Sequence, residues 1–305
     1  MTHSRRAFSE LDKQLASYLI PIPIGSQLLS SRELAELFGA SLGSISAALN
    51  HLEKIGAITI NRRGRMGSFL EAKSTAMLWS IAADGPMVIA LTLPSFPKCE
   101  GLATAIYSLL NSAGIETYLT FIRGSFNRIK ALKGGLCHAV VVSALTADAL
   151  DGSETDIIVR LPPQTFVTDH RVFFRSSTDN HKRLIVGIDY DSYDIKYLTE
   201  LEFADSDVQF QQMPFTQTDL NLERSSVDAA ISNADHLGRL MGKEFSSRPL
   251  SPKVQTIIGD RDTSAAVLVK GGDIATKAVL TEILRTDDIL HIQQKVVDGL
   301  IVPRY

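Results

Sequence analysis

Arginine occupies three of the four positions from 62 to 65, where Arg62, Arg63 and Arg65 surround Gly64. Guanidinium groups bind phosphate oxygens through paired hydrogen bonds and stay positively charged at any physiological pH. With Gly64 and Gly67 to turn the chain, the segment predicts a two-stranded hairpin with cations at its tip. Such a hairpin suits phosphate contacts or insertion into the minor groove of DNA. The alternative is a solvated basic turn on an ordinary pair of helices.

A second group of reactive side chains follows a buried strand in mid-chain. Leu184-Ile-Val-Gly-Ile188 runs directly into Asp189 and Asp191. This pattern resembles the nucleophile loop of haloacid-dehalogenase-type phosphatases, which implies that Asp189 attacks phosphorus while Asp191 acts as acid and base. Ile258-Gly-Asp-Arg-Asp262 resembles the magnesium-binding loop of those enzymes. The mid-chain position, the short interval and the crowding by Asp194 favour the alternative, in which these acids line a binding cleft or cap a helix.

Two short amphipathic helices precede the arginine hairpin. Ser30 or Ser31 can cap the first helix, whose apolar face contains Leu34, Ala35, Leu37 and Phe38 and which Gly39 ends. Ser41 caps the second helix, in which Ile45, Ala48, Leu49 and Leu52 point inward. The order of helix, turn, helix and basic hairpin predicts a winged helix-turn-helix, an α+β domain in which the second helix enters a groove of DNA.

These motifs resemble the GntR superfamily of bacterial transcription regulators. The segments that carry the resemblance are Gly25-Ser-Gln-Leu28, Ser30 to Gly39 and Arg62 to Leu70. Family members carry arginines early in the recognition helix, whereas Leu42 and Ser46 stand at the matching positions here. We therefore expect contacts to the DNA backbone to be better preserved than guanine readout by arginine. The residues expected to contact DNA are Arg32, Ser41, Ser44, Ser46, Asn50, Arg62, Arg63 and Arg65.

Charge separates this N-terminal part from the rest of the chain. Residues 1 to 75 contain nine Lys+Arg and six Asp+Glu, a net charge of 9 − 6 = +3, whereas the remaining 230 residues contain 22 and 28, a net charge of −6. The first part can meet polyanionic DNA, and the second should avoid it. No apolar run approaches the length of a membrane span and no leader pattern opens the chain, so we expect a cytoplasmic protein without membrane contact.

From residue 86 the hydrophobic pattern alternates between strands and helices. Strands are expected at 88–93, 117–122 and 139–142, with helices between them, and the same order restarts with strands at 184–188, 208–213 and 227–231. Gly134 to Ala144 and Ser225 to Ala234 end in the same way, with a short polar residue followed by alanine. This alternation predicts two similar lobes with parallel sheets, and the strand at 265–269 and the last two helices return to the first lobe.

Two such lobes resemble the periplasmic-binding-protein-like effector domains of bacterial regulators. The resemblance implies a two-lobed α/β domain of type II behind the winged helix, and the combination resembles the YhfZ-type regulators. We expect residues 1–75 to form the DNA-binding domain and residues 76–305 the effector domain. Its first lobe is expected at about 80–165 plus 264–305, and its second lobe at about 166–263.

Ligands of open α/β lobes bind beyond the carboxyl ends of the strands. That rule selects serine hydroxyls and helix starts that could hold a small anionic or zwitterionic metabolite. Each of these serines on its own is more often a plain helix cap. The residues selected are Ser95, Phe96, Arg123, Gly124, Ser125, Ser143, Asp189, Asp191, Ser192, Tyr193, Thr216 and Asn233.

The sequence thus predicts a ligand-responsive transcription regulator. A metabolite would bind between the lobes of a homodimer and change its affinity for a double-stranded DNA operator. Cys99 and Cys137 have no metal-like spacing, the histidines are scattered, and no motif calls for a cofactor, so we expect neither metal, cofactor nor catalysis. The alternatives are the phosphatase built on Asp189 and Asp191, and a C-terminal domain that serves only assembly.

Overall fold

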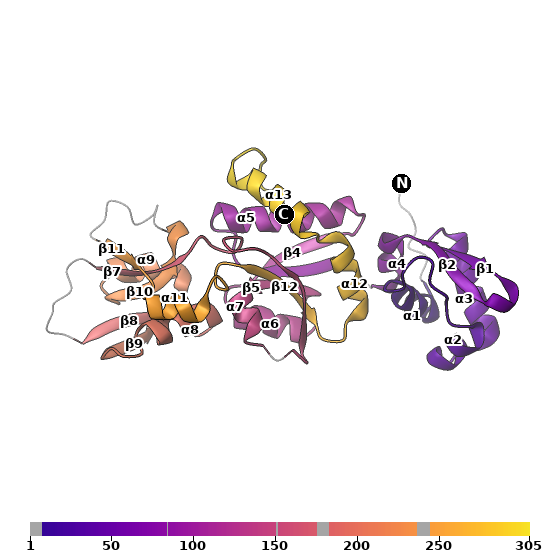
Figure 1. Cartoon of the computed structure of the whole chain (residues 1–305), viewed down its shortest axis with the longest axis horizontal. Helices are drawn as coiled ribbons and strands as arrows, with labels where there is room; N and C mark the ends of the chain where they lie inside the picture. Colours follow the sequence, from indigo (N-terminus) through magenta and orange to yellow (C-terminus); the bar gives the residue numbers. More distant parts are fainter. Residues whose placement is uncertain (1–7, 84, 151, 176–182, 237–244) are drawn as a thin grey trace. The chain divides into compact units, whose positions relative to one another are not determined.

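A computed structural model describes residues 8–83, 85–150, 152–175, 183–236 and 245–305 (Figure 1). The chain divides into two compact units. One unit comprises Met1–Met87, Leu109–Tyr118 and Asp273–Ile283, and the other comprises Val88–Ser108, Leu119–Gly272 and Leu284–Tyr305.

The N-terminal part of the first unit is a helix-turn-helix with a wing. Its elements are α1 (Glu10–Leu19), α2 (Ser31–Phe38), α3 (Leu42–Lys54), β1 (Ile58–Arg62), β2 (Ser68–Lys73) and α4 (Thr75–Ala82). Ser30 and Glu33 form a capping box at the start of α2, and Gly39 ends it in the left-handed conformation (φ 62°). Ile45, Ala48, Leu49 and Leu52 are the buried stripe of α3. The expected helix caps and inward face are confirmed.

The wing is an antiparallel pair, β1 with β2, joined by the 3₁₀ turn Gly64–Met66. Gly64 (φ 56°) and Gly67 (φ 90°) both adopt backbone conformations that other residues avoid, so the glycines allow the chain to reverse there. The α4 helix packs on α1 and buries Leu78, Trp79 and Ile81. The segment after the wing is therefore a short helix that forms part of this small domain's core.

Two five-stranded sheets with the same plan follow. The first sheet has the order β4-β3-β5-β12-β6 and the second the order β9-β8-β10-β7-β11, read from the corresponding edge. The strands of the first are β3 (Met87–Leu91), β4 (Thr117–Phe121), β5 (Ala139–Ser143), β6 (Thr155–Arg160) and β12 (Ala265–Lys270); those of the second are β7 (His170–Arg175), β8 (Leu184–Ile188), β9 (Val208–Gln212), β10 (Ala229–Asn233) and β11 (Phe245–Pro249). The expected repeat of two similar lobes is confirmed.

The sheets are mixed, where the sequence predicted parallel ones. β3 pairs with β5 and β8 with β10 in parallel, but β12 runs antiparallel to β5 and β6, and β7 antiparallel to β10 and β11. The chain passes from the first lobe to the second after β6 and returns after β11, and the first strand after each crossover, β7 or β12, is the one that runs antiparallel to its neighbours. A buried apolar run such as 265–269 has the same sequence pattern in either direction.

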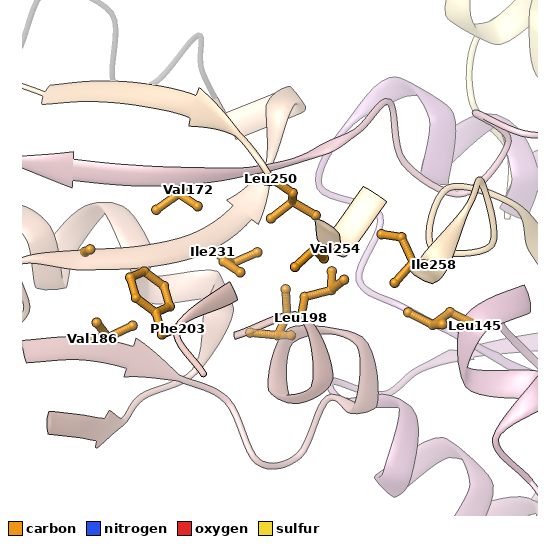
Figure 2. Close-up of a cluster of buried hydrophobic side chains, with 11 residues drawn as sticks. Leu145, Val172, Val186, Leu198, Phe203, Ile231, Leu250, Val254 and Ile258 are labelled. Carbon is orange, nitrogen blue, oxygen red and sulfur yellow. The ribbon is translucent and has the colours of Figure 1, made fainter. Parts of the chain in front are cut away.

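Helices cover the sheets. The helices of the lobes are α5 (Pro97–Ser112), α6 (Ser125–Lys133), α7 (Ala144–Asp148), α8 (Tyr193–Glu202), α9 (Thr218–Glu223), α11 (Pro252–Ile258), α12 (Ile274–Ile283) and α13 (Thr286–Val297). Figure 2 shows a core cluster of the second lobe, in which Leu198 of α8, Ile231 of β10 and Val254 of α11 are buried together. Leu145 of α7 joins this cluster from the first lobe, so apolar packing also links the two lobes.

Candidate functional site

The helix-turn-helix presents a groove between α3 and the wing. Its lining comes from the segment before α2, the start of α2, α3 and both strands of the wing. The residues that line it are Leu28, Leu29, Ser31, Ser46, Leu49, Asn50, Ile60, Arg62 and Ser68. Ser46, Asn50 and Arg62, three of the residues expected to contact DNA, therefore share one concave surface.

Ser41 and Ser44 are engaged at the start of α3. The Ser44 backbone N–H donates to Ser41 Oγ at 3.0 Å, and the two hydroxyl oxygens lie 2.9 Å apart. Both side chains are exposed. One N–H group of the first turn of α3 is thus already bonded to Ser41, and contact of these two serines with DNA stays a prediction.

Arg62 is fixed by the recognition helix. Its guanidinium donates to both carboxylate oxygens of Glu53, at 2.6 and 3.2 Å, and to Asn50 Oδ1 at 3.3 Å. The Glu53 charge neutralises much of the field of Arg62, while the bond to Asn50 orients an amide on the exposed face of α3. Arg62 therefore lies at the base of the wing and differs in its surroundings from the other two wing arginines.

Arg63 and Arg65 lie nearer the tip of the wing. The Arg63 guanidinium carbon sits 4.7 Å from the centre of the Phe69 ring, a cation–π contact that leaves its charge intact. Arg65 is exposed within the 3₁₀ turn. Arg32, in the first turn of α2, forms a loose ion pair with Glu36 at 3.7 Å, with both side chains largely exposed.

A cavity of about 40 Å³ lies between the two lobes of the second unit. First-lobe residues come from the segments that follow β3 and β4 and from α6. The others come from the segment before β7, the start of β7, the start of α8, the segment that follows β9 and the end of β10. The cavity is lined by Thr92, Ser95, Phe96, Gly124, Ser125, Arg128, Phe166, Val167, His170, Ser192, Asp194, Ile195, Phe215 and Asn233. Its position beyond the carboxyl ends of parallel strands is the one expected for ligands of α/β lobes.

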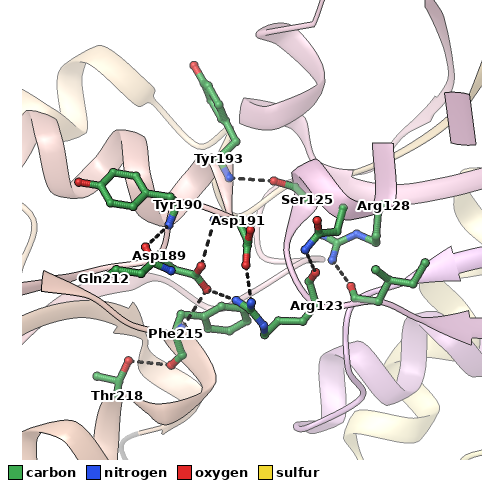
Figure 3. A network of polar contacts seen from close by, with 12 residues as sticks. Arg123, Ser125, Arg128, Asp189, Tyr190, Asp191, Tyr193, Gln212, Phe215 and Thr218 are labelled. Atoms are coloured by element: carbon green, nitrogen blue, oxygen red, sulfur yellow. Dashed lines mark hydrogen bonds and ion pairs between the residues drawn. The ribbon is translucent and has the colours of Figure 1, made fainter. Parts of the chain in front are cut away.

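The lobes are joined beside this cavity by an ion-pair cluster (Figure 3). Arg123 of the first lobe pairs with Asp189 at 2.7 Å and with Asp191 of the same second-lobe loop. The Asp189 carboxylate is fully buried and also accepts the backbone N–H groups of Asp191 (3.1 Å) and Phe215 (2.9 Å). With its oxygens bound to a guanidinium and two N–H groups, Asp189 is poorly placed to attack phosphorus, and this geometry disfavours the phosphatase alternative.

The start of α6 touches the same second-lobe loop. The Phe126 N–H donates to the Asp191 carbonyl oxygen at 3.1 Å, and the Tyr193 N–H donates to Ser125 Oγ at 2.9 Å. Gly124, which precedes the helix with φ 80°, is packed so closely that an added Cβ would lie 2.5 Å from the Asp191 carbonyl oxygen. The two lobes are thus in direct backbone contact along one side of the cavity.

Asp194, which lines the cavity, also connects the two lobes. Its Oδ1 accepts hydrogen bonds from Ser143 Oγ at 2.6 Å and from Thr146 Oγ1 at 2.9 Å, both from the first lobe. Burial raises the pKa of Asp194 above its ordinary value, while the two hydroxyls and the nearby His170 favour its charged form. Ser143 is completely buried and therefore acts on the cavity through Asp194.

Two polar atoms at the cavity have no partner among the described residues. Arg128 is 3% exposed, and although its Nη1 donates to the Ile122 carbonyl at 2.8 Å, its Nε donates to nothing. Asn233, 4% exposed, has an unpaired Oδ1. Burial lowers the pKa of Arg128 to about 10, which Asp194 partly offsets, so the guanidinium is still charged at neutral pH. Buried groups of this kind are normally hydrogen-bonded.

His170 and Asp262 form a buried pair next to the cavity. His170 Nδ1 lies 2.7 Å from Asp262 Oδ2, and both side chains are at most 6% exposed. Burial lowers the pKa of His170, but the hydrogen bond and charge of Asp262, with Asp194 and Asp169 nearby, outweigh it and raise the pKa above its ordinary value. A charged His170 therefore stabilises the folded domain.

This pair predicts that the domain loses stability as the pH rises. Because the pKa of His170 is higher in the folded chain than in the unfolded chain, its contribution is complete below the unfolded value of 6.5 and is lost as the pH rises through the folded value. The urea concentration at the midpoint of unfolding, measured from about pH 6 upward, should decrease across this pH window. In the matched variant Asp262→Asn the fall should be smaller, and an identical fall in both proteins would contradict the assignment.

The structure distributes the expected ligand residues over three kinds of position. Ser95, Phe96, Gly124, Ser125, Ser192 and Asn233 line the cavity, whereas Arg123, Ser143, Asp189, Asp191 and Tyr193 join the lobes around it. Thr216 lies in the 3₁₀ turn Phe215–Gln217, of which Phe215 lines the cavity. Arg128, His170 and Phe166 also line the cavity, although no sequence pattern selected them.

Among the described residues, no cluster of three or more histidine, cysteine or acidic side chains has a geometry that could hold a metal ion. None of the described helices combines the length and the apolar composition that a membrane span requires.

Comparison with known proteins identifies both parts of the chain. Residues 74–305 match the YhfZ C-terminal domain, and residues 23–70 match a helix-turn-helix domain. The uncharacterized protein YhfZ of Escherichia coli K12 is 32% identical over 294 residues, which cover 95% of each chain. The crystal structure of YhfZ from Shigella flexneri is similar with a TM-score of 0.61 and 28% identity, covering 76% of this chain and 98% of that one. An ancestral arginine-binding protein bound to arginine is more distant, with a TM-score of 0.48, 16% identity, and coverage of 69% of this chain and 97% of that one.

The order of the elements agrees with these matches. A helix-turn-helix domain is followed by an α/β domain that resembles periplasmic-binding-protein folds, as the sequence predicted, although its sheets are mixed and not parallel. With its C-terminal 232 residues matched by the family's own domain and a full-length relative at 32% identity, the chain belongs to the YhfZ family.

Proposed function

We propose that this chain is a transcription regulator whose two-lobed domain binds a small molecule between its lobes and thereby changes its affinity for DNA. The helix-turn-helix and the YhfZ C-terminal domain together suggest such a regulator. The GntR-like wing supplies exposed cations for the phosphate backbone, and a homodimer would place two such heads on paired half-sites. A protein that binds chromosomal DNA would be located in the cytoplasm.

The observation that supports ligand binding is the pair of buried polar atoms on opposite lobes that have no hydrogen-bond partner. Arg128 Nε belongs to the first lobe and Asn233 Oδ1 to the second, and both residues line the same cavity. Leaving one buried polar group without a hydrogen bond costs about 1–3 kcal/mol. A ligand that bonds to both groups recovers that free energy only when the lobes are together. Ligand binding would therefore be coupled to the interlobe geometry.

The first test is thermal unfolding of the full chain with a panel of metabolites that spans amines, amino acids, carboxylates, phosphate esters and nucleosides. A ligand at about one hundred times its Kd stabilises the folded state by about 2.7 kcal/mol, which raises Tm measurably. The same ligand should change the affinity for DNA by the factor by which DNA changes the affinity for the ligand. A panel without any stabilising compound, or a ligand whose affinity ignores DNA, would contradict the proposal.

The second test separates the wing arginines. Arg65→Ala should weaken binding to a duplex of arbitrary sequence and reduce the slope of log K against log salt by about 0.9 for each phosphate that the variant no longer neutralises. Arg62→Ala should change the slope less, because Glu53 already neutralises that guanidinium. Lys270→Gln, which removes one charge from the effector domain, is the matched control and should leave the slope unchanged. A larger effect of Arg62→Ala than of Arg65→Ala would show that the wing tip does not bind phosphate.

A further inference from the structure

The interlobe cavity contains one cation, one anion and an uncharged acceptor. Arg128 supplies a guanidinium, Asp194 a carboxylate that is 5% exposed, and Asn233 the unpaired Oδ1. His170 and Asp262 satisfy each other and add no net charge when paired. The cavity is therefore close to electrically neutral.

The donor side of the cavity requires an anion. No carboxylate of the described residues lies within ion-pair distance of the Arg128 guanidinium, whereas Arg123, only five residues earlier, pairs with two. A desolvated guanidinium binds a carboxylate more strongly than any neutral acceptor, because the hydrogen bonds are charge-assisted. Within the described chain, Arg128 Nε is the one buried guanidinium N–H that lacks an acceptor.

The acceptor side requires a donor. Asn233 Oδ1 can only accept, and the nearby Asp194 would repel a second negative group and attract a positive one. A protonated amine satisfies both, since it donates up to three hydrogen bonds and carries a charge opposite to that of Asp194. The rings of Phe96, Phe166 and Phe215 add apolar walls that also tolerate a cation.

From this arrangement we infer that the ligand of the cavity is a small amino acid, whose carboxylate binds Arg128 and whose ammonium group binds Asn233 near Asp194. The inference rests on the proposed function and specifies its effector. Size favours a short side chain, because about 40 Å³ accommodates only a few water molecules at about 10–15 Å³ each. A long side chain would force the Arg123 ion pairs apart.

The test uses the full chain and three matched probes, L-alanine, L-alaninamide and propionate, beside the other short-chain amino acids glycine and L-serine. Alaninamide lacks the carboxylate and propionate lacks the amine. We expect at least one of the three amino acids to raise Tm and to release heat in calorimetry. For that amino acid, the amide that lacks the carboxylate and the acid that lacks the amine should each bind at least about tenfold more weakly, since each loses charge-assisted hydrogen bonds.

Variants assign the two ends. Arg128→Met keeps the length of the side chain and should abolish the effect of the amino acid, whereas Arg160→Met, on an exposed arginine of the first lobe, should not. Asn233→Leu should weaken the amino acid at least about tenfold. If Arg128→Met fails to fold, Arg128→Lys takes its place. It keeps the positive charge but not the planar guanidinium, so it should retain part of the amino-acid binding.

The outcomes distinguish this inference from the proposed function. Stabilisation by a nucleoside, a phosphate ester or a carboxylate without an amine, with no response to short amino acids, would overturn the amino-acid assignment and leave a ligand-binding regulator. Equal binding of L-alanine, L-alaninamide and propionate would also overturn it, because the cavity would then recognise neither the carboxylate nor the ammonium group. No response to any compound of the wider panel would count against both.

Discussion

Replacing Gly124 with alanine is expected to separate the two lobes while each lobe stays folded. The added Cβ would lie 2.5 Å from the Asp191 carbonyl oxygen and 2.8 Å from the Asp191 Cβ, and Gly124 has a φ of 80°. The backbone oxygen cannot move away as the end of a flexible side chain could, so the second-lobe loop must withdraw. Withdrawal breaks the Phe126 to Asp191 hydrogen bond and the ion pairs of Arg123.

The matched control is Gly135→Ala. Gly135 has a φ of 72°, which gives a similar backbone strain of about 1–2 kcal/mol, but an added Cβ would meet nothing within 4 Å. The distance between spin labels at Lys130→Cys of the first lobe and Gln217→Cys of the second reports closure, because the native cysteines are buried. Gly124→Ala should lengthen and broaden this distance, and Gly135→Ala should only lower the stability. Unchanged distances in Gly124→Ala would show that the lobe contact is dispensable.

Replacing Asp194 with alanine is expected to lower the free energy of unfolding of the effector domain by about 3 kcal/mol. The change leaves the buried hydroxyls of Ser143 and Thr146 without their acceptor and leaves the Arg128 charge without a nearby acid. Hydrogen bonds to a charged group contribute about 1.5–3 kcal/mol each, part of which the desolvation of Asp194 offsets.

Asp194→Asn isolates the charge from the hydrogen bonds. The amide oxygen can still accept from Ser143 and Thr146, and the raised pKa of Asp194 means that its charge is costly in the folded state. We expect a loss below about 1 kcal/mol at pH 7. Asp205→Ala, which removes an exposed partner of Lys253, should leave the stability nearly unchanged. Urea unfolding measures all three, and equal losses for alanine and asparagine would contradict the hydrogen-bond argument.

Local sequence rules predicted most of the elements because each rule acts within a few residues. The capping box at Ser30, the left-handed Gly39 and the buried stripe of α3 depend on neighbours within one or two turns. The ten lobe elements expected from residues 88 to 231 also formed, with boundaries that differ by a few residues. Strand direction was not predicted correctly, since the direction of β12 and β7 depends on how the chain crosses between lobes.

The candidate site was predictable where it follows from strand ends and not where it depends on helix interiors. Asn233 is the last residue of β10, and Ser125 begins α6 in the loop that follows β4, so the strand-end rule found both. Arg128 lies inside α6, where a basic residue normally extends into solvent, and only the tertiary structure buries it. His170 begins β7, a strand that the hydrophobic pattern did not predict, and its partner Asp262 lies 92 residues later.

Serine at strand ends proved to have two uses. Ser143 caps α7, with the Thr146 N–H donating to its Oγ at 2.9 Å, and its own proton goes to Asp194 on the other lobe. The interpretation of Ser143 as a plain helix cap therefore accounts for one of these two hydrogen bonds. The sequence pattern shows the cap, because the cap is local, but gives no sign of an acceptor 51 residues away.

The position of β12 bears on how the protein is made. This strand lies between β5 and β6 in the first sheet, yet it follows β6 by roughly one hundred residues, and the whole second lobe is synthesised in between. On the ribosome, β6 emerges long before the strand that must separate it from β5. The sheet of the second lobe, contained within residues 170–249, can close first and bring the ends of that interval together. We therefore expect nascent chains that end before residue 265 to protect the second lobe from proteases before the first.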